Sequence, residues 1–166
     1  TVDITNLNRQ IIATEKNIGK KKVDACEERI LEINPQINVL KHNIFYSKKT
    51  ASEINLKNYD YVIDAIDSVT SKILLIEECI KNNIPIISCM GTGGKLSPQA
   101  LKVDYIENTK GCPLARVIRR ELKARNITKV KVVYSEEECK NDCDLLLSAE
   151  KKTSGRPAPS SMIFVP

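Results

Sequence analysis

The sequence predicts an α/β protein with a mostly parallel sheet, helices on both faces of that sheet and an antiparallel extension. Two observations lead to this prediction. From residue 59 to 94, two short apolar segments flank a helical segment, which is the pattern of a βαβ crossover. After Gly94 two segments alternate apolar and polar residues, as strands of an exposed, antiparallel extension do.

The first half of the chain predicts two helices and three strands. Apolar residues recur at helical spacing from residue 19 to 34, and Asn34-Pro35 ends that helix. The segment INVLKHNIF, residues 37–45, predicts a strand. The run YDYVIDAID (59–67) predicts a buried strand, residues 68–83 a helix, and IPIISCMGTGG (84–94) a second buried strand that breaks into glycines.

The second half predicts a helix between two strands, followed by a loop. ALKVDYI (100–106) and VKVVYS (130–135) are the predicted strands of the extension, and PLARVIRRELKARN (113–126) is the helix. Residues 136–161 are polar and predict a mobile surface loop before a last strand, MIFV, at 162–165.

The composition is that of one globular domain over residues 1–166, with 42% hydrophobic and 28% charged residues. No apolar run approaches the ~20 residues of a membrane span, so we expect a soluble, cytoplasmic protein. The net charge of +5 permits a nucleic-acid partner without requiring one. Six cysteines without a C-x-x-C pair predict reduced thiols and no structural zinc, since Cys139 and Cys143 form only a lone C-x-x-x-C.

Asp67 is a candidate for ligand binding because it directly follows the strand predicted within residues 59–67. In open parallel sheets, ligands bind beyond the carboxyl ends of the strands. A carboxylate there could hold a magnesium ion that bridges nucleotide phosphates. Alternatively, Asp67 caps the following helix, with Ser68 and Thr70 as rivals for that role. Asp64 lies inside the strand, where we expect a structural role.

The segment TNLNRQIIATEKNIGKKK, residues 5–22, is rich in polar and basic side chains and poor in apolar ones. Arg9 offers a planar fork for phosphate oxygens, and Lys22 offers a mobile positive charge. Together they suit a phosphate that reacts with loss of pyrophosphate. The alternative is that the Lys20–Lys22 run is merely a solvated charged face.

These motifs are more specific in combination. TNLNRQ, then Lys22 in GKKK, then INP and YVIDAIDSVTSK resemble the ThiF/MoeB/HesA family of ATP-dependent adenylating enzymes, relatives of the ubiquitin-activating enzymes. The resemblance covers residues 1 to about 106 and implies a Rossmann-like domain that uses ATP and magnesium. By position it implies that the ATP phosphates contact Asn6, Arg9, Gln10 and Lys22, and that Asp67 completes the cofactor-binding set through the magnesium and adenylate chemistry. It implies magnesium binding for Asp67, and catalysis for Arg9, Lys22 and Asp67.

Within that family, MGTGGKLSPQALKVDYIENT (90–109) and CPLARVIRRELK (112–123) are similar to the branch that dehydrates threonylcarbamoyladenosine in tRNA. KVVYSEE and SMIFVP extend this likeness, and the two C-x-x-C zinc pairs usual in the sulfur-carrier branch are absent from the sequence. The resemblance implies carboxylate adenylation followed by cyclisation, with tRNA as partner, a homodimer and room for a sulfur-transfer partner. Two alternatives stay open: adenylation of the C-terminal glycine of a ubiquitin-like sulfur carrier, and a non-catalytic nucleotide- or RNA-binding subunit.

The predicted helix at 113–125 has two sides of different character. One side is apolar and carries Leu114, Val117, Ile118 and Leu122. The opposite side is basic and carries Arg116, Arg119, Arg120 and Lys123. The basic side could lie along an RNA backbone, where phosphate contacts position a protein. The alternative is an ordinary solvated helix face.

Cys112 directly precedes this helix. A helix N-terminus favours the thiolate, so Cys112 is a candidate nucleophile for an acyl group. The alternative is a thiol without a catalytic role, as for the other five cysteines.

A glycine-rich phosphate loop that opens a helix is absent from the sequence. GTGG at 91–94 follows a predicted strand, but the next residues, KLSPQ, contain a proline and do not open a helix. The resemblance implies a glycine-rich strand, loop and helix upstream of Thr1, and a helix after Pro166. We therefore expect the chain to be a fragment of one ThiF-like adenylating domain.

Overall fold

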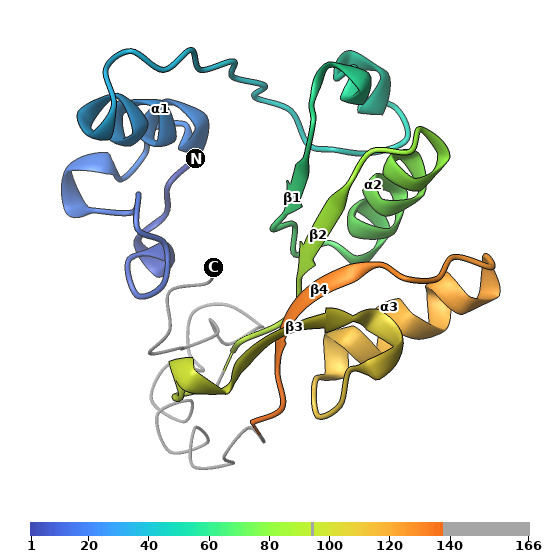
Figure 1. Cartoon of the computed structure of the whole chain (residues 1–166). Helices are drawn as coiled ribbons and strands as arrows, with labels where there is room; N and C mark the ends of the chain where they lie inside the picture. The colour runs from blue at the N-terminus through green and yellow to red at the C-terminus, as the bar shows by residue number, and fades with distance from the viewer. Residues whose placement is uncertain (94, 138–166) are drawn as a thin grey trace.

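The computed structural model describes residues 1–93 and 95–137 (Figure 1). Most of the predicted loop at 136–161, all of the predicted strand at 162–165, and both Cys139 and Cys143 lie outside the described residues. Each helix in the described ranges is too short or too polar to span a lipid bilayer.

A four-stranded sheet forms the centre of the described chain. Its order is β1 (Val62–Asp64), β2 (Ile86–Cys89), β4 (Lys131–Ser135) and β3 (Leu101–Tyr105). β1, β2 and β4 run parallel, whereas β3 pairs antiparallel with β4. The predicted fold class, a mostly parallel sheet with an antiparallel extension, is confirmed.

The place of β4 differs from the expectation. We expected residues 130–135 in an exposed extension, but β4 lies inside the sheet between β2 and β3. Val132 and Tyr134 of this strand are buried in the core. The connection through the helix at 113–124 returns the chain to the same sheet, where β4 runs parallel to β2 and antiparallel to β3. β3 is therefore the edge strand on this side of the described sheet.

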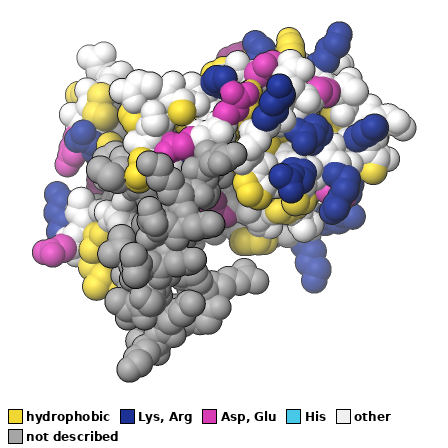
Figure 2. All heavy atoms as spheres, turned by 90° about the horizontal axis from the view of Figure 1, so that it is seen from below, with side chains coloured by type: hydrophobic (Ala, Val, Ile, Leu, Met, Phe, Trp, Pro, Cys, Tyr) yellow, Lys and Arg dark blue, Asp and Glu magenta, His cyan; other side chains and the backbone are white. Residues whose placement is uncertain are grey.

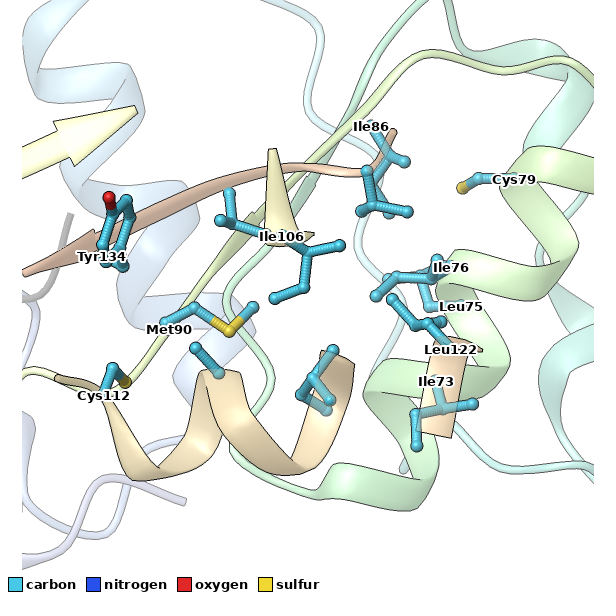
Figure 3. Close-up of a cluster of buried hydrophobic side chains, with 14 of the residues drawn as sticks. Ile73, Leu75, Ile76, Cys79, Ile86, Met90, Ile106, Cys112, Leu122 and Tyr134 are labelled. Atoms are coloured by element: carbon cyan, nitrogen blue, oxygen red, sulfur yellow. The ribbon is translucent and has the colours of Figure 1, made fainter. Parts of the chain in front are cut away.

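Two helices, α2 (Val69–Lys81) and α3 (Pro113–Ala124), lie on one side of the sheet. Their apolar side chains meet those of β2 and β4 in one buried cluster (Figure 3). Ile76 of α2, Ile118 and Leu122 of α3, and Val132 of β4 are completely buried in it. Burial of this apolar surface is the main force that fixes both helices on the sheet.

The third helix, α1 (Lys22–Ile33), lies across the sheet from α2 and α3 in Figure 1. It belongs to a smaller apolar cluster, in which Ala25 packs with Val2 and Ala13. Two 3-10 turns, Ile4–Asn6 and Glu15–Asn17, carry the chain around this cluster. The N-terminal segment therefore has its own small core.

The predicted strand at residues 37–45 is wrong, because these residues form neither strand nor helix. Ile37, Leu40 and Phe45 stay exposed. A strand needs a neighbour for its backbone N–H and C=O groups, and none of the described strands pairs with this segment. Two further 3-10 turns, Ala51–Glu53 and Leu56–Asn58, lead from it to β1.

The start of α3 depends on a glycine. Gly111 has a φ of +70°, and a Cβ there would lie 2.9 Å from the backbone oxygen of Glu136, just after β4. A side chain at this position would be strained for two reasons: the positive φ is unfavourable for residues other than glycine, and the Cβ would crowd the backbone of Glu136. This close approach sets where α3 begins relative to the end of β4.

Shortening a completely buried side chain should destabilise the fold. Replacing Ile76→Ala removes packing against both α3 and the sheet, and we expect the free energy of unfolding to fall by about 2–5 kcal/mol. The control is Leu40→Ala, which is 68% exposed and should change it by less than about 0.5 kcal/mol. Urea unfolding followed by circular dichroism measures both, and equal effects would contradict the placement of this core.

Candidate functional site

A cavity of about 150 Å³ lies at the carboxyl ends of β1 and β2. It is lined by residues 65–67, which follow β1, residues 89–93, at the end of β2, and by Arg9 and Leu114. This is where ligands bind in open parallel sheets. A larger groove of about 810 Å³ lies between residues 46–57 and α2, but it is away from the strand ends and is the weaker candidate.

Asp67 lines the cavity with an exposed side chain. The cap of α2 is Ser68, whose Oγ accepts a hydrogen bond from the backbone N–H of Ser71 at 3.4 Å. The alternative that Asp67 or Thr70 caps this helix is therefore wrong. Among the described residues, the Asp67 carboxylate forms neither an ion pair nor a hydrogen bond, so it is available to a ligand.

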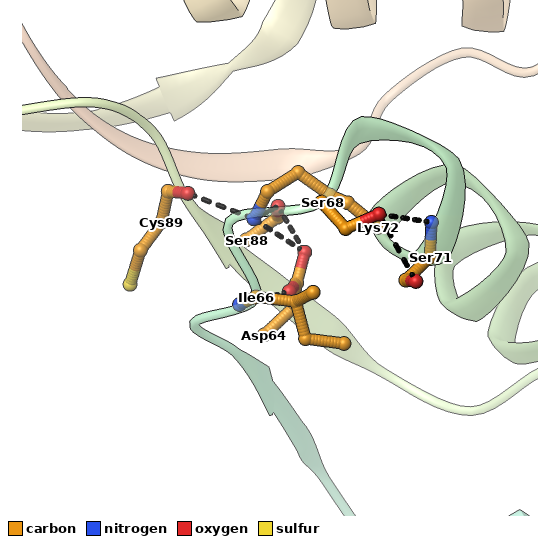
Figure 4. A network of polar contacts seen from close by, with 7 residues as sticks. All are labelled: Asp64, Ile66, Ser68, Ser71, Lys72, Ser88 and Cys89. Atoms are coloured by element: carbon orange, nitrogen blue, oxygen red, sulfur yellow. Dashed lines mark hydrogen bonds and ion pairs between the residues drawn. The ribbon is translucent and has the colours of Figure 1, made fainter. Parts of the chain in front are cut away.

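A buried ion pair joins β1 to α2 next to the cavity-lining residues 65–67 and Cys89, and its hydrogen bonds extend to β2 (Figure 4). Nζ of Lys72 lies 2.8 Å from Oδ2 of Asp64, and both side chains are 0% exposed. Nζ also donates to Oγ of Ser88 at 3.2 Å and to the backbone oxygen of Cys89 at 2.9 Å. Ser88 donates in turn to Oδ2 of Asp64. The structural role expected for Asp64 agrees with this arrangement.

The same network shapes the turn that carries Asp67. Oδ1 of Asp64 accepts a hydrogen bond from the backbone N–H of Ile66 at 2.9 Å, which folds the chain just after β1. Asp67 is the next residue along. By fixing the backbone of Ile66, the buried Asp64 side chain also fixes the position of the adjacent Asp67.

Lys72 was not recognised from the sequence as important. A signal was present, because Lys72 lies among Ser71, Ile73, Leu75 and Ile76 on the buried face of α2, where a lysine is rarely found without a partner. Its partner Asp64 is eight residues earlier, in a different element, and nothing in the sequence alone joins the two.

Arg9 reaches the cavity from the N-terminal segment, with its guanidinium braced within its own turn. Nη1 donates to the backbone oxygen of Thr5 at 2.6 Å and to Oδ1 of Asn8 at 2.9 Å. Asp3 and Asn6 hold this turn as a reciprocal cap. Two hydrogen bonds from Thr5, the larger effect coming from its backbone N–H and the smaller from its hydroxyl, keep the pKa of the Asp3 carboxyl below its usual value. Asp3 therefore caps the turn as a carboxylate.

Of the residues predicted to bind ATP, the cavity brings together Arg9 and Asp67. Asn6, Gln10 and Lys22 are not among its lining residues. Asn6 is buried, and its Oδ1 accepts a hydrogen bond from the backbone N–H of Asp3. Lys22 begins α1, which is anchored in the small N-terminal core and not at the strand ends.

The two cysteines near the cavity are buried. Cys112 is the cap residue of α3, is 4% exposed, and directs its thiol to the backbone oxygen of Gly91 at 3.6 Å. It packs in the main core, and this burial favours the packing role over that of a nucleophile. Burial also raises the pKa of Cys89, which lines the cavity, so Cys89 is a neutral thiol.

The cations of α3 fall into two groups. Arg116, Arg120 and Lys123 are exposed. Arg119 is half-buried, and its Nη1 donates to the backbone oxygen and the hydroxyl of Thr109 at 2.6 and 2.8 Å. Its predicted place on the exposed basic face is therefore wrong, because its charge is used to fasten α3 to the preceding turn.

Three comparisons relate the chain to known proteins. The model of the ThiF family matches residues 1–140. The tRNA threonylcarbamoyladenosine dehydratase of Bacillus subtilis is 41% identical over 137 residues, 82% of this chain and 54% of that protein. The solved structure of the Escherichia coli dehydratase in complex with AMP superposes with a TM-score of 0.77 at 36% identity, covering 83% of this chain and 59% of that one. Its complex with ATP gives 0.76 and 35%, covering 84% and 61%.

The chain spans about half the length of the curated relatives it matches. The residues matched by the family model, 1–140, include Arg9 and both strand ends of the cavity.

Breaking the buried ion pair should cost far more than breaking a surface pair. Lys72→Met leaves the Asp64 carboxylate buried without its counter-charge, and we expect the free energy of unfolding to fall by about 3–5 kcal/mol. The double variant Asp64→Leu with Lys72→Met should be less destabilised than the sum of the two single variants, because it leaves no buried charge.

The control is Lys20→Met, which removes an ion pair of similar length, 2.9 Å, between half-exposed side chains. It should change the free energy of unfolding by less than about 1 kcal/mol. Additive effects of the two core substitutions in urea unfolding would show that Asp64 and Lys72 are not coupled.

Proposed function

The chain belongs to the ThiF family, and from this premise we propose that the protein dehydrates threonylcarbamoyladenosine in tRNA at the expense of ATP. The observation that carries the proposal is that Arg9 and Asp67 line the same cavity at the strand ends. The 41% identity with the Bacillus subtilis dehydratase supports the choice of substrate. The Escherichia coli structures, described as complexes with AMP and with ATP, support the choice of co-substrate.

The chemistry requires that a poor leaving group be replaced by a good one. A carboxylate oxygen of the substrate attacks the α-phosphorus of ATP, the bond to pyrophosphate breaks, and an acyl adenylate forms. A nitrogen of the same modified base then attacks the acyl carbon and loses its proton. AMP departs with the former carboxylate oxygen, so a ring closes with net loss of water.

The residues of the cavity contribute mainly by charge and position. The braced guanidinium of Arg9 would stabilise the negative charge that builds on the phosphate oxygens, and it needs little reorganisation to do so. Asn6, Gln10 and Lys22 belong to the same N-terminal segment, and we assign to them phosphate contacts beyond the cavity itself. Lys22 would interact with the leaving pyrophosphate as a mobile cation.

Asp67 fits a magnesium ion that is shared with ATP. Magnesium in nucleotide sites is usually held by one or two carboxylates together with substrate phosphates. Asp67 supplies one accessible carboxylate, and no group of three or more His, Cys, Asp or Glu side chains among residues 1–93 and 95–137 forms a separate metal site. When bound, the ion would offset phosphate charge and favour departure of pyrophosphate.

The resemblance to the family also supports proposals on the oligomeric state, the location and the partners of the protein. The enzyme would act as a homodimer in the cytoplasm, with tRNA as its macromolecular substrate. A sulfur-transfer protein is a further partner consistent with the family. Cys112 would not form a covalent intermediate with the substrate, since it is buried against Gly91.

Removing either charge from the cavity should abolish most of the turnover. We expect Arg9→Ala and Asp67→Asn each to reduce it by about a hundredfold or more, because Arg9 would offset charge on the reacting phosphates and Asp67 would hold the magnesium ion that does the same. The assay combines full-length protein, ATP and tRNA that carries threonylcarbamoyladenosine. AMP release and mass spectrometry of the nucleosides follow the two half-reactions.

Arg29→Ala and Asp60→Asn are matched controls, because both side chains are exposed and neither lines the cavity. They should keep turnover within about twofold of the parent protein. Release of AMP that depends on a ubiquitin-like carrier protein and not on tRNA would contradict the proposal in favour of the sulfur-carrier reaction.

A further inference from the structure

We propose that Arg116, Arg120 and Lys123 form a basic stripe on α3 that binds the phosphate backbone of the RNA substrate. That this RNA is tRNA rests on the proposed function. The stripe itself is argued from the charge, exposure and spacing of these three residues, and from its distance along the helix to the cavity.

The spacing of the three cations places them on one side of α3. They lie at positions i, i+4 and i+7, which fall within a narrow sector of the helix at 100° per residue. With a rise of 1.5 Å per residue, they extend along about 10 Å of the axis. A nucleic-acid duplex presents several phosphates over that length, so the three cations can each meet one.

The other arginines near the stripe are engaged within the protein. Arg119 donates to Thr109, as described above. Arg125 pairs with Glu77 at 2.7 Å and with Glu121 at 2.9 Å. Glu121 also contacts Arg120, but at 3.4 Å, and the Arg120 side chain is still 76% exposed. The positive charge of the stripe is therefore largely available to a partner.

The surface of α3 favours a polyanion over a protein partner. None of the exposed large hydrophobic side chains among the described residues belongs to α3. Protein interfaces depend on buried aromatic and aliphatic anchors, whereas phosphate contacts need only accessible cations. Figure 2 shows Lys and Arg side chains gathered on the side of the molecule that carries α3.

The stripe begins close to the candidate site. Leu114, in the first turn of α3, lines the cavity together with Arg9 and Asp67. Arg116 is two residues further along the helix. Ala115, Ile118 and Leu122 are buried, so α3 holds the stripe at a fixed place relative to the cavity. Along the helix axis, Arg116 lies about 3 Å and Lys123 about 14 Å from Leu114, so an RNA seated on the stripe lies along the helix whose first turn lines the cavity.

The test compares two triple variants of the full-length protein with the same change in net charge. The first is Arg116→Gln, Arg120→Gln and Lys123→Gln. The control is Lys48→Gln, Lys49→Gln and Lys57→Gln, which are exposed lysines outside α3. The probe is an unmodified tRNA transcript without ATP, whose dissociation constant is measured at several salt concentrations. Thermal unfolding by circular dichroism checks that both variants are folded.

We expect the α3 variant to bind the transcript at least about tenfold more weakly at low salt. The slope of log affinity against log salt should fall by about 2–3, close to one for each phosphate that the variant no longer neutralises. With the modified tRNA, KM should rise while kcat at saturation stays near that of the parent protein. The control variant should change the slope by less than about one.

Equal salt slopes in the two variants would overturn the proposal. So would unchanged RNA binding together with weakened binding of an acidic carrier protein, because the stripe would then recognise a protein. The proposed function is tested separately, by whether mass spectrometry detects the cyclic nucleoside in tRNA treated with the parent protein and ATP. Stripe-dependent RNA binding in a parent protein that forms no cyclic product would contradict the dehydratase function and support the stripe.

Discussion

Three elements of the fold meet at the ammonium group of Lys72. Its three N–H donors have three acceptors: Asp64 at the end of β1, and the hydroxyl of Ser88 and backbone oxygen of Cys89 on β2. Removing two charges from water costs several kcal/mol per ion, and this cost is offset only when geometry and hydrogen bonding are nearly complete. The pair therefore tolerates few arrangements of β1, β2 and α2. The relative position of the two strand ends, and hence the cavity above them, depends on it.

Asp64 and Asp67, three residues apart, differ in burial and therefore in role. Asp64 is completely enclosed and uses both carboxylate oxygens to hold Lys72, Ser88 and the backbone of Ile66. Asp67 follows the turn made by Asp64 and lies exposed at the cavity. Because Ser68 caps α2, the Asp67 carboxylate does not serve the helix. A buried carboxylate thus positions an accessible one at the cavity.

The side chains of α3 point in different directions and contribute to the core, to the cavity wall and to a charged surface. Ile118 and Leu122 bury one side against α2 and the sheet, and Leu114 closes one wall of the cavity. The exposed side carries cations, some of which bind within the protein while others face solvent. Since the helix is fixed by its apolar side, any partner of the exposed cations is held at a set place relative to Arg9 and Asp67.

The sequence by itself determined the fold class and the order of helices and strands around the βαβ unit. It also predicted the segments of Arg9 and Asp67 as site segments, and both residues line the same cavity. Period-two and helical spacing, together with turn residues, are local signals. They identified the strands of the sheet and the three α-helices found in residues 1–93 and 95–137. They failed at residues 37–45, where the alternating pattern has no partner strand among the described residues, and they put β4 in an exposed extension instead of the interior.

Only the tertiary structure decided which charged groups are buried, braced or accessible. Lys72 and Asp64 are neighbours because a strand and a helix pack together, and Arg119 is occupied because Thr109 lies beside it. Likewise, Arg9 joins Asp67 at the cavity, while Lys22 stays outside its lining. The physical reason is that burial and pairing of a charge are set by contacts between elements distant in the chain, which residue spacing along one element does not encode.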